Sequence, residues 1–242
     1  PLLPPGTEVP LAAVGVAVDG AVRLDRLAAG QSAAPLACAA RPEDLGVIVS
    51  SGGTTGVPHG SWRSFAGYGA LIAAPSPPDR RQLVNGPLAY LSQTLVDATL
   101  LGGGTVLLRD GFDAAQTLVD IERERITHLF LVEPQLFELM DHPDVPWRDL
   151  SSLRQLTHVG ASAPPTLRKR ARDRLGPVIT HVYGASDMGL VSLLPPAPDG
   201  SADQDTSSAG RLLPGVALRL RRADGDLAGP DEAGIVEIRS PA

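Results

Sequence analysis

The sequence predicts an α/β fold in which a mainly parallel sheet is flanked by helices, with the start of a β-rich subdomain at the C-terminus. From residue 46 to residue 183, short apolar runs alternate with segments of helical character, which is typical of βαβ units. After residue 210, two alternating segments are separated by Asp224-Gly225, a turn signal. We therefore expect an α/β core over residues 1–194, a mobile loop over 195–209 and the start of the subdomain over 210–242.

Each expected element follows from a local pattern. Gly46–Ser50 is a short run rich in β-branched residues, consistent with a buried strand. Ser61, Asp113 and Pro134 are residue types favoured where a helix begins. The expected strands cover residues 9–18, 46–50, 82–84, 104–108, 127–132, 153–159, 178–183, 216–222 and 235–239. The expected helices cover residues 61–74, 92–101, 113–125, 134–140 and 165–175, and residues 28–41 are expected to form a loop.

Composition and charge narrow the class of protein. The 242 residues are 43% apolar and 20% charged, with a net charge of −6, so general disorder is not expected and bulk charge gives no reason to expect nucleic-acid binding. No run of about 18 apolar residues is present, so no membrane span is expected. The start lacks the pattern of a signal peptide, which favours a cytoplasmic location. The sequence gives no oligomeric state and is compatible with a homodimer.

The single cysteine and a short basic run are both expected to have structural rather than functional roles. The single cysteine, Cys38, excludes an intramolecular disulfide framework and a multi-cysteine metal site. Its small neighbours favour a buried or incidental thiol over a nucleophile. The basic run from Arg168 to Arg172 falls on an expected helix, and we interpret it as a solvated face rather than a binding patch.

A loop rich in Gly, Ser and Thr separates the strand at 46–50 from the helix expected at 61–74. Ser50, Ser51, Thr54 and Thr55 lie among three glycines within seven positions. Glycines allow consecutive main-chain N–H groups to converge on one anion, and the hydroxyls add donors. A flexible turn is the alternative. The lysine of a Walker A loop is missing, and no G-x-G-x-x-G is present.

The loop resembles a signature of the adenylate-forming superfamily, which includes acyl-CoA synthetases, luciferases and peptide-synthetase adenylation domains. Residues 51–60 match Ser/Thr-Gly-Gly-Thr-Thr-Gly-x-Pro-Lys-Gly at nine of ten places. Further segments resemble the family's later motifs in the same order. Residues 121–127 and 149–154 look more like bacterial fatty-acid-CoA ligases than like peptide-synthetase domains. The later segments are 87–90, 101–108, 111–113, 153–161, 181–187, 210–215 and 234–238.

This resemblance implies the use of ATP, Mg²⁺ and coenzyme A to activate a carboxylic acid. The expected enzyme is an AMP-forming acid–thiol ligase of fatty acid metabolism. It would form an acyl-adenylate and then transfer the acyl group to CoA, so its partners would be a small carboxylic acid and CoA.

The resemblance also implies roles for individual residues. Thr54 and Asp187 are the expected catalytic and Mg²⁺-binding residues, and Tyr183 would pack on adenine while Ser186 contacts the α-phosphate. The substrate pocket would include Tyr90, Gly160 and Gly184. The expected nucleotide-binding residues are Ser51, Gly52, Gly53, Thr54, Thr55, Gly56, His59, Gly160, Ala161, Tyr183, Gly184 and Ser186.

The sequence departs from the family pattern at two functional positions. His59 stands where the family usually has Lys, which removes a permanent charge near the pyrophosphate. Asp187 stands where the family has Glu, which shortens the metal ligand by one methylene. These departures motivate one alternative, a nucleotide-binding relative that has kept the fold but lost catalysis. An adenylating enzyme that loads a carrier protein rather than CoA is a further alternative.

The resemblance also implies that the chain is a truncated N-terminal portion. The family's Thr-Gly-Asp motif and the C-terminal subdomain with the adenylation lysine do not occur in it. We therefore expect this polypeptide alone to be inactive.

Overall fold

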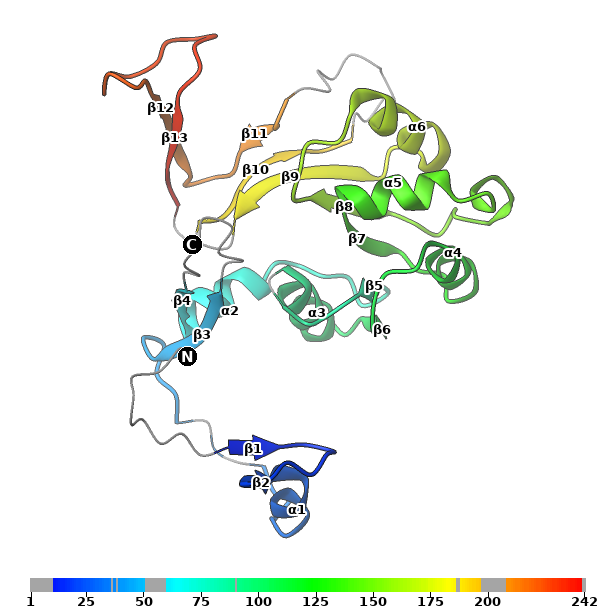
Figure 1. Cartoon of the computed structure of the whole chain (residues 1–242), viewed down its shortest axis with the longest axis vertical. Helices are drawn as coiled ribbons and strands as arrows, with labels where there is room; N and C mark the ends of the chain where they lie inside the picture. The colour runs from blue at the N-terminus through cyan, green and yellow to red at the C-terminus, as the bar shows by residue number, and fades with distance from the viewer. Residues whose placement is uncertain are drawn as a thin grey trace. The chain divides into compact units, whose positions relative to one another are not determined.

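The computed structural model describes residues 11–35, 37, 39–50, 60–89, 91–185, 188–196 and 208–240. The chain divides into two compact units, residues 1–40 and residues 41–242. In the first unit, β1 (Leu11–Ala13) pairs in parallel with β2 (Ala21–Arg23), and α1 (Leu24–Ala29) follows directly (Figure 1). The expected strand over 9–18 is therefore shorter where it is described, and Gly15, at φ +76°, lies just beyond its end.

A seven-stranded sheet forms the centre of the second unit, in the order β11-β10-β9-β8-β7-β5-β6. The pairs from β6 through β5, β7 and β8 to β9 are parallel, whereas β10 and β11 add antiparallel strands at one side. This confirms the predicted α/β class with a mainly parallel sheet (Figure 1). The strands are β5 (Arg81–Asn85), β6 (Thr105–Arg109), β7 (His128–Val132), β8 (Gln155–Val159), β9 (Ile179–Ala185), β10 (Gly189–Leu194) and β11 (Arg211–Leu212).

The helices begin where the sequence places good starting residues. The Asp113 carboxylate accepts a hydrogen bond from Gln116 N at 2.7 Å and caps the following helix, as predicted. Proline occupies the first turn of the next two helices. The helices are α3 (Leu91–Leu101), α4 (Ala114–Arg123), α5 (Glu133–Asp141) and α6 (Pro165–Leu175), with a short 3₁₀ turn at Val145–Trp147.

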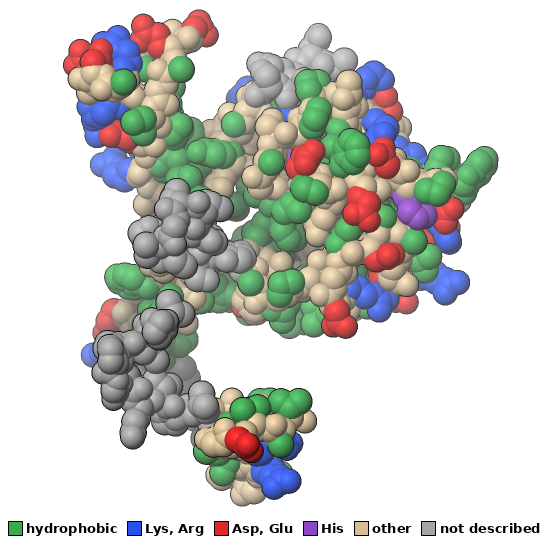
Figure 2. All heavy atoms as spheres, in the orientation of Figure 1, with side chains coloured by type: hydrophobic (Ala, Val, Ile, Leu, Met, Phe, Trp, Pro, Cys, Tyr) green, Lys and Arg blue, Asp and Glu red, His purple; other side chains and the backbone are tan. Residues whose placement is uncertain are grey.

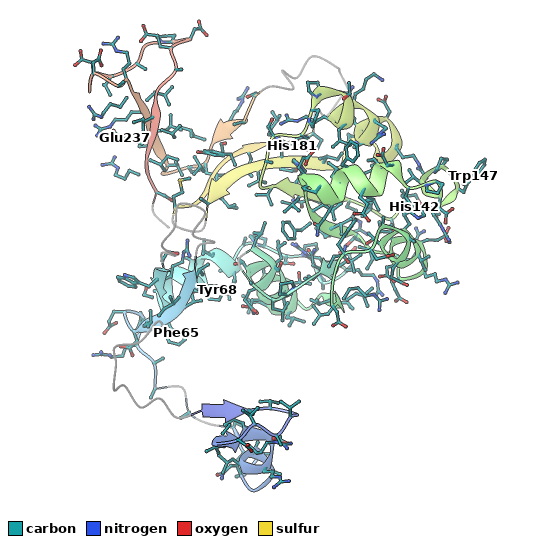
Figure 3. All side chains as sticks on the ribbon, viewed as in Figure 1. Phe65, Tyr68, His142, Trp147, His181 and Glu237 are labelled. Carbon is teal, nitrogen blue, oxygen red and sulfur yellow. The ribbon has the colours of Figure 1, made fainter. Side chains whose placement is uncertain are left out.

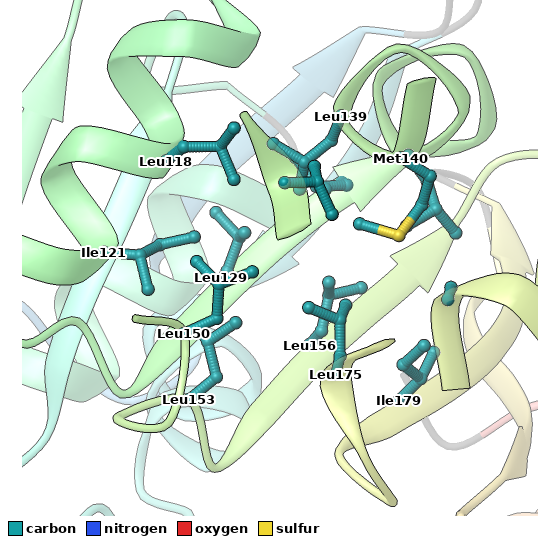
Figure 4. Close-up of a cluster of buried hydrophobic side chains, with 14 of the residues drawn as sticks. Leu118, Ile121, Leu129, Leu139, Met140, Leu150, Leu153, Leu156, Leu175 and Ile179 are labelled. Carbon is teal, nitrogen blue, oxygen red and sulfur yellow. The ribbon is translucent and has the colours of Figure 1, made fainter. Parts of the chain in front are cut away.

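One hydrophobic core lies between the parallel strands and α4, α5 and α6. Leu83, Leu129, Leu156 and Ile179 are directly paired neighbours across four strands and form one apolar row. Leucines and isoleucines from the three helices close over this row (Figure 4). Because full burial of such a side chain contributes roughly 1.5–3 kcal/mol, this row and its cover fix the strand register.

A separate two-stranded hairpin carries the ends of the Gly/Ser/Thr loop. β3 (Leu45–Ser50) pairs antiparallel with β4 (Gly60–Ser64), with Ser50 opposite Gly60. The helix expected over 61–74 was wrong at its start, because this segment first completes the hairpin. The helix, α2, is Phe65–Ile72 and is capped by Ser64. The expected burial of the 46–50 strand was also wrong: none of residues 46–49 is buried, and Ile48 is 64% exposed.

The C-terminal part of the described chain is a second hairpin, as the alternating pattern predicted. β12 (Ala217–Arg221) pairs antiparallel with β13 (Ile235–Arg239). Gly225 has φ +93° and donates its N–H to Arg222 O, which forms the expected turn. Glu237 accepts hydrogen bonds from Arg219 and Arg221 on the facing strand (Figure 3).

Charges of both signs are interspersed over the face of the α/β body that Figure 2 displays. Many of them pair, as in Arg154–Asp79 at 2.6 Å and Arg148–Glu122 at 3.0 Å. Exposed pairs of this kind contribute little to stability. Within the described ranges, no helix has the length and apolar character needed to cross a bilayer.

A buried ion pair fastens α4 to β6, and its loss is expected to destabilise the fold. The Asp120 carboxylate is 3% exposed and accepts two hydrogen bonds from Arg109, at 2.7 and 2.8 Å. Burial raises the pKa of Asp120, but Arg109 and Gln116 outweigh it and hold the pKa below its ordinary value. We expect Asp120→Asn to cost about 2 kcal/mol at pH 7, less than for a fully buried pair because Arg109 is 39% exposed.

The pH dependence gives this expectation its sign. A lowered folded-state pKa stabilises the fold above the unfolded-state pKa of about 4, and that contribution disappears as the pH falls further. Urea unfolding at pH 7 and pH 3 should therefore show a difference between wild type and variant that shrinks at pH 3. Asp141→Asn, which breaks an exposed pair with Arg170, is the control and should change stability by less than about 0.5 kcal/mol. Equal losses in both variants would contradict the expectation.

Candidate functional site

A pocket of about 360 Å³ opens at the carboxyl ends of β8 and β9. Ligands of open α/β sheets commonly bind at this edge, because successive loops leave the sheet there. The pocket walls come from the ends of the two strands, from α6 and from the segment that precedes β11. The lining residues are His158, Gly160, Ala161, Ser162, Arg168, His181, Val182, Tyr183, Gly184, Ser208 and Ala209.

The floor of the pocket is polar because the apolar row of the core gives way to histidines one step along the strands. Leu131 pairs with His158, and His158 pairs with His181, directly beyond the row that contains Leu156 and Ile179. The Nδ1 atoms of the two histidines are 3.0 Å apart, and their rings meet edge to face with centroids 5.0 Å apart. His158 is 1% exposed, and its Nε2 has no hydrogen-bond partner among the described residues.

Both imidazoles are neutral at physiological pH. Burial, together with the nearby positive charge of Arg168, lowers the pKa of His158 to about 4. Burial likewise lowers the pKa of His181 to about 3, with additional repulsion from Arg168 and His158. A hydrogen bond between two neutral Nδ1 atoms holds one proton. One ring therefore has Nε2 as an acceptor and the other has Nε2–H as a donor.

Arg168 lies beneath the pocket rather than on a solvated face. Its side chain is 8% exposed, and its guanidinium donates to Ala163 O at 3.1 Å and to Ser162 Oγ at 3.4 Å. The prediction for the basic run was therefore wrong at Arg168. It was right for Lys169 and Arg170, whose side chains are 69% and 45% exposed. Arg168 faces inward because it follows the buried side of α6 together with Ala171 and Leu175.

Two of the expected site glycines meet different backbone requirements. Gly160 has φ +102°, a conformation that residues with a Cβ rarely adopt. Gly184 lies beside β10, and a Cβ on it would come within 2.4 Å of Gly189 O. Both residues line the pocket, so the backbone at its rim can approach a ligand closely.

The structure brings together four of the residues expected at the nucleotide and substrate sites: Gly160, Ala161, Tyr183 and Gly184. Tyr183 is 37% exposed at the pocket. The other expected residues lie outside the described residues, and their roles stay predictions. These are Ser51, Gly52, Gly53, Thr54, Thr55, Gly56, His59, Tyr90, Ser186 and Asp187.

The flanking residues of the undescribed segments have defined positions. Ser50 and Gly60, on either side of residues 51–59, are directly paired in the β3–β4 hairpin. Ser186 and Asp187 fall between Ala185, the last residue of β9, and Met188, whose N–H donates to Ala185 O at 3.2 Å.

The sequence analysis assigned only four of the pocket residues, and among those it missed are the three with ionisable side chains: His158, His181 and Arg168. Strand alternation was the available signal for the first two, because each lies two residues after a core residue on the same strand face. Their contact depends on the register between β8 and β9, which the local sequence does not specify.

The described residues contain no group of three or more His, Cys, Asp or Glu side chains arranged to hold a metal ion. The two residues expected to bind Mg²⁺, Thr54 and Asp187, are outside those residues. The pocket itself offers imidazole, guanidinium and hydroxyl groups around a cavity. These groups suit a polar organic ligand better than a cation.

The chain is similar in sequence and structure to enzymes that have been characterised. Residues 6–242 match the model of a family described as AMP-binding enzyme. The chain is 34% identical over 76% of its length to a medium/long-chain-fatty-acid–CoA ligase, FadD8, of Mycobacterium tuberculosis. It is 31% identical over 83% of its length to an indoleacetate–CoA ligase of Aromatoleum aromaticum. Among solved structures, the amide bond synthetase McbA of Marinactinospora thermotolerans is 33% identical, with a TM-score of 0.80 over 95% of this chain.

The chain is much shorter than these proteins. It spans 32% of FadD8, 40% of the indoleacetate–CoA ligase and 47% of McbA.

The histidine pair predicts a pH-dependent stability. Because the folded-state pKa values lie below the ordinary value of about 6.5, the unfolded chain binds more protons between pH 6.5 and pH 4. The free energy of unfolding should therefore fall as the pH is lowered through this window. His158→Gln removes one of the titrating groups. We expect it to reduce the slope by roughly 1 kcal/mol per pH unit in urea unfolding measured at several pH values, and an unchanged slope would contradict the assignment.

Gly184→Ala tests the close approach of β9 and β10. The added methyl group has to displace the backbone of Gly189, so we expect a loss of about 1–3 kcal/mol in thermal unfolding. Gly69→Ala in α2 is the control, since a Cβ there meets no atom within 4 Å, and it should leave stability unchanged or raise it slightly. The close approach would be refuted by equal stabilities of the two variants.

Proposed function

The chain belongs to the family of AMP-binding enzymes, and we propose that the protein it forms part of is an acyl-CoA synthetase that activates a carboxylic acid with ATP. The observation that carries this proposal is the pocket at the ends of β8 and β9. It contains Gly160, Ala161, Tyr183 and Gly184, the described residues for which the family motifs predict contacts with the nucleotide and the acid. The similarity to two CoA ligases supports the same reaction class.

The proposed reaction has two balanced steps. The carboxylate oxygen attacks the α-phosphorus of ATP, which forms an acyl-adenylate and releases pyrophosphate. The CoA thiolate then attacks the acyl carbon, which forms the thioester and releases AMP. Both steps depend on positioning the reactants and on stabilising negative charge.

The residues of this chain divide these tasks. Main-chain amides and the hydroxyls of Thr54 and Thr55 would bind the terminal phosphates, and Ser186 the α-phosphate. Mg²⁺, held by Asp187 with Thr54, would neutralise phosphate charge. The ring of Tyr183, exposed at the pocket, would pack against the adenine.

For the acid itself, we propose a fatty acid, in line with the 34% identity to FadD8. An aromatic acid is the competing substrate, because the indoleacetate–CoA ligase is almost as similar. A panel of fatty and aryl acids in a coupled AMP-release assay distinguishes them by the ratio of their kcat/KM values.

A second candidate function differs only in the acceptor. McbA, an amide bond synthetase, matches 95% of this chain at 33% identity, which favours an amine as the nucleophile in the second step. Competition between CoA and a primary amine for the preformed acyl-adenylate decides between thioester and amide products.

The central prediction concerns the first half-reaction. In the full-length protein that contains these residues, we expect ATP–pyrophosphate exchange that depends on the acid. Thr54→Ala and Asp187→Asn should each reduce it by roughly 100-fold, the typical effect of removing one group that stabilises transition-state charge. Thr166→Ala at the exposed start of α6 and Asp224→Asn in the exposed turn after β12 are matched controls that should keep wild-type activity.

The outcome also separates the alternatives. Binding of MgATP in calorimetry without any exchange would favour a nucleotide-binding relative that has lost catalysis, in keeping with His59 and Asp187. Failure to bind either MgATP or a non-hydrolysable acyl-adenylate analogue would refute the proposed function. Because the 242 residues span about a third of FadD8, we expect them alone to bind nucleotide without sustained turnover.

A further inference from the structure

A side-chain hydrogen bond joins α2 to α3. The hydroxyl of Tyr68 on α2 donates to the carboxylate of Asp97 on α3, 29 residues further along the chain. The side chain of Gln93, one turn earlier on α3, donates to the other oxygen of Asp97 at 2.8 Å. Figure 3 labels Tyr68 on α2, next to the β3–β4 hairpin. The carboxylate is thus held from its own helix and is oriented to receive the phenol.

α2 and the β3–β4 hairpin form one unit. α2 follows β4 without a break, and β4 pairs with β3 along its length. The first turn of α2 is also tied to the chain before β3, because Phe65 N donates to Asp44 O at 3.0 Å and Ala66 N to Pro42 O at 2.9 Å. A displacement of α2 therefore moves both strands of the hairpin, including their ends at Ser50 and Gly60.

Few apolar contacts attach α2 and the β3–β4 hairpin to the large sheet. α2 has no fully buried side chain, and its eight residues include Gly67 and Gly69. Its principal neighbour among the elements around the large sheet is α3, which in turn packs on β5 and β6. When few apolar contacts fix an interface, a part-buried hydrogen bond to a charged acceptor has a larger share in setting its geometry.

The hydrogen bond between Tyr68 and Asp97 persists over a wide pH range. Burial and the Asp97 carboxylate raise the pKa of Tyr68 to about 12. The phenol therefore remains a donor at neutral and mildly alkaline pH.

We propose that Tyr68 is a positioning residue that, through Asp97, sets the place of the β3–β4 hairpin relative to α3 and the large sheet. The inference rests on the proposed function in one respect: residues 51–59, which join β3 to β4, are the ones expected to bind the terminal phosphates of ATP. The pocket residues come from β8, β9, α6 and the segments that follow β8 and precede β11, and none of them lies on α2 or in the β3–β4 hairpin. Loss of the link should consequently affect ligands with β- and γ-phosphates and spare those without them.

The test measures the affinity of the full 242-residue chain for two ligands by calorimetry. MgATP carries the terminal phosphates, and a non-hydrolysable acyl-adenylate analogue does not. We expect Tyr68→Phe to weaken MgATP binding about tenfold, the equivalent of one hydrogen bond, and to change analogue binding less than twofold. Asp97→Asn, which retains an oxygen to accept from the phenol, should restore most of the MgATP affinity that Asp97→Leu loses.

Ser152→Ala provides a control for general destabilisation. The buried Ser152 hydroxyl is within hydrogen-bond distance of Ile121 O in α4 and Ile126 O just after it, and it is outside the pocket lining. Its loss should change the two affinities equally. Equal effects of Tyr68→Phe on both ligands, or no effect on either, would overturn the positioning role. Wild-type protein that binds neither ligand would instead overturn the proposed function, so the two failures are distinguishable.

Discussion

The apolar row across β5, β7, β8 and β9 is the constraint on which the rest of the second unit depends. Leu83, Leu129, Leu156 and Ile179 are paired side by side and are covered by α4, α5 and α6. A slip of one residue in any strand would turn its side chains to the opposite face. Burial of this row therefore fixes which residues meet at the carboxyl ends of the strands, and so determines the pocket.

The row of residues beyond this apolar row forms the pocket floor and lowers the stability of the fold. Where an apolar core would continue, His158 and His181 occupy the paired positions, and His158 is almost fully buried. Two neutral rings that share one proton satisfy each other on one side only. The buried Nε2 of His158 carries the penalty of an unmade hydrogen bond. Such polar groups are retained in a core at the expense of stability, which is common where a protein binds ligands.

The sequence predicted the regular elements well wherever one local rule governed them. The cap at Asp113 and the prolines in the first turns of α5 and α6 are local features, and the structure confirms each. The segment after residue 60 was interpreted as helix because a serine precedes an apolar stretch. Pairing of Gly60–Ser64 with β3 overrides that local preference, and the helix takes Ser64 as its cap instead.

The site was predictable only as far as its motifs are contiguous. Gly160, Ala161, Tyr183 and Gly184 come from two short segments, and parallel pairing of β8 with β9 was sufficient to unite them. The imidazole pair and the Tyr68–Asp97 hydrogen bond join side chains that lie 23 and 29 residues apart, and Arg168 donates to the backbone oxygen of Ala163. No local pattern specifies such contacts, because they depend on register and on which helix face is buried.

The glycines of the site also show that a motif can be shared for reasons other than chemistry. Gly160 is required by its backbone conformation, and Gly184 by the carbonyl of Gly189. Both are needed to form the strand ends whether or not a ligand is bound, so their match to the family is evidence of a shared fold. The two departures, His59 and Asp187, fall instead at positions that the family motifs predict to face phosphate and metal. A change at such a position bears on catalytic activity, whereas a glycine that the backbone requires is kept for the sake of the fold.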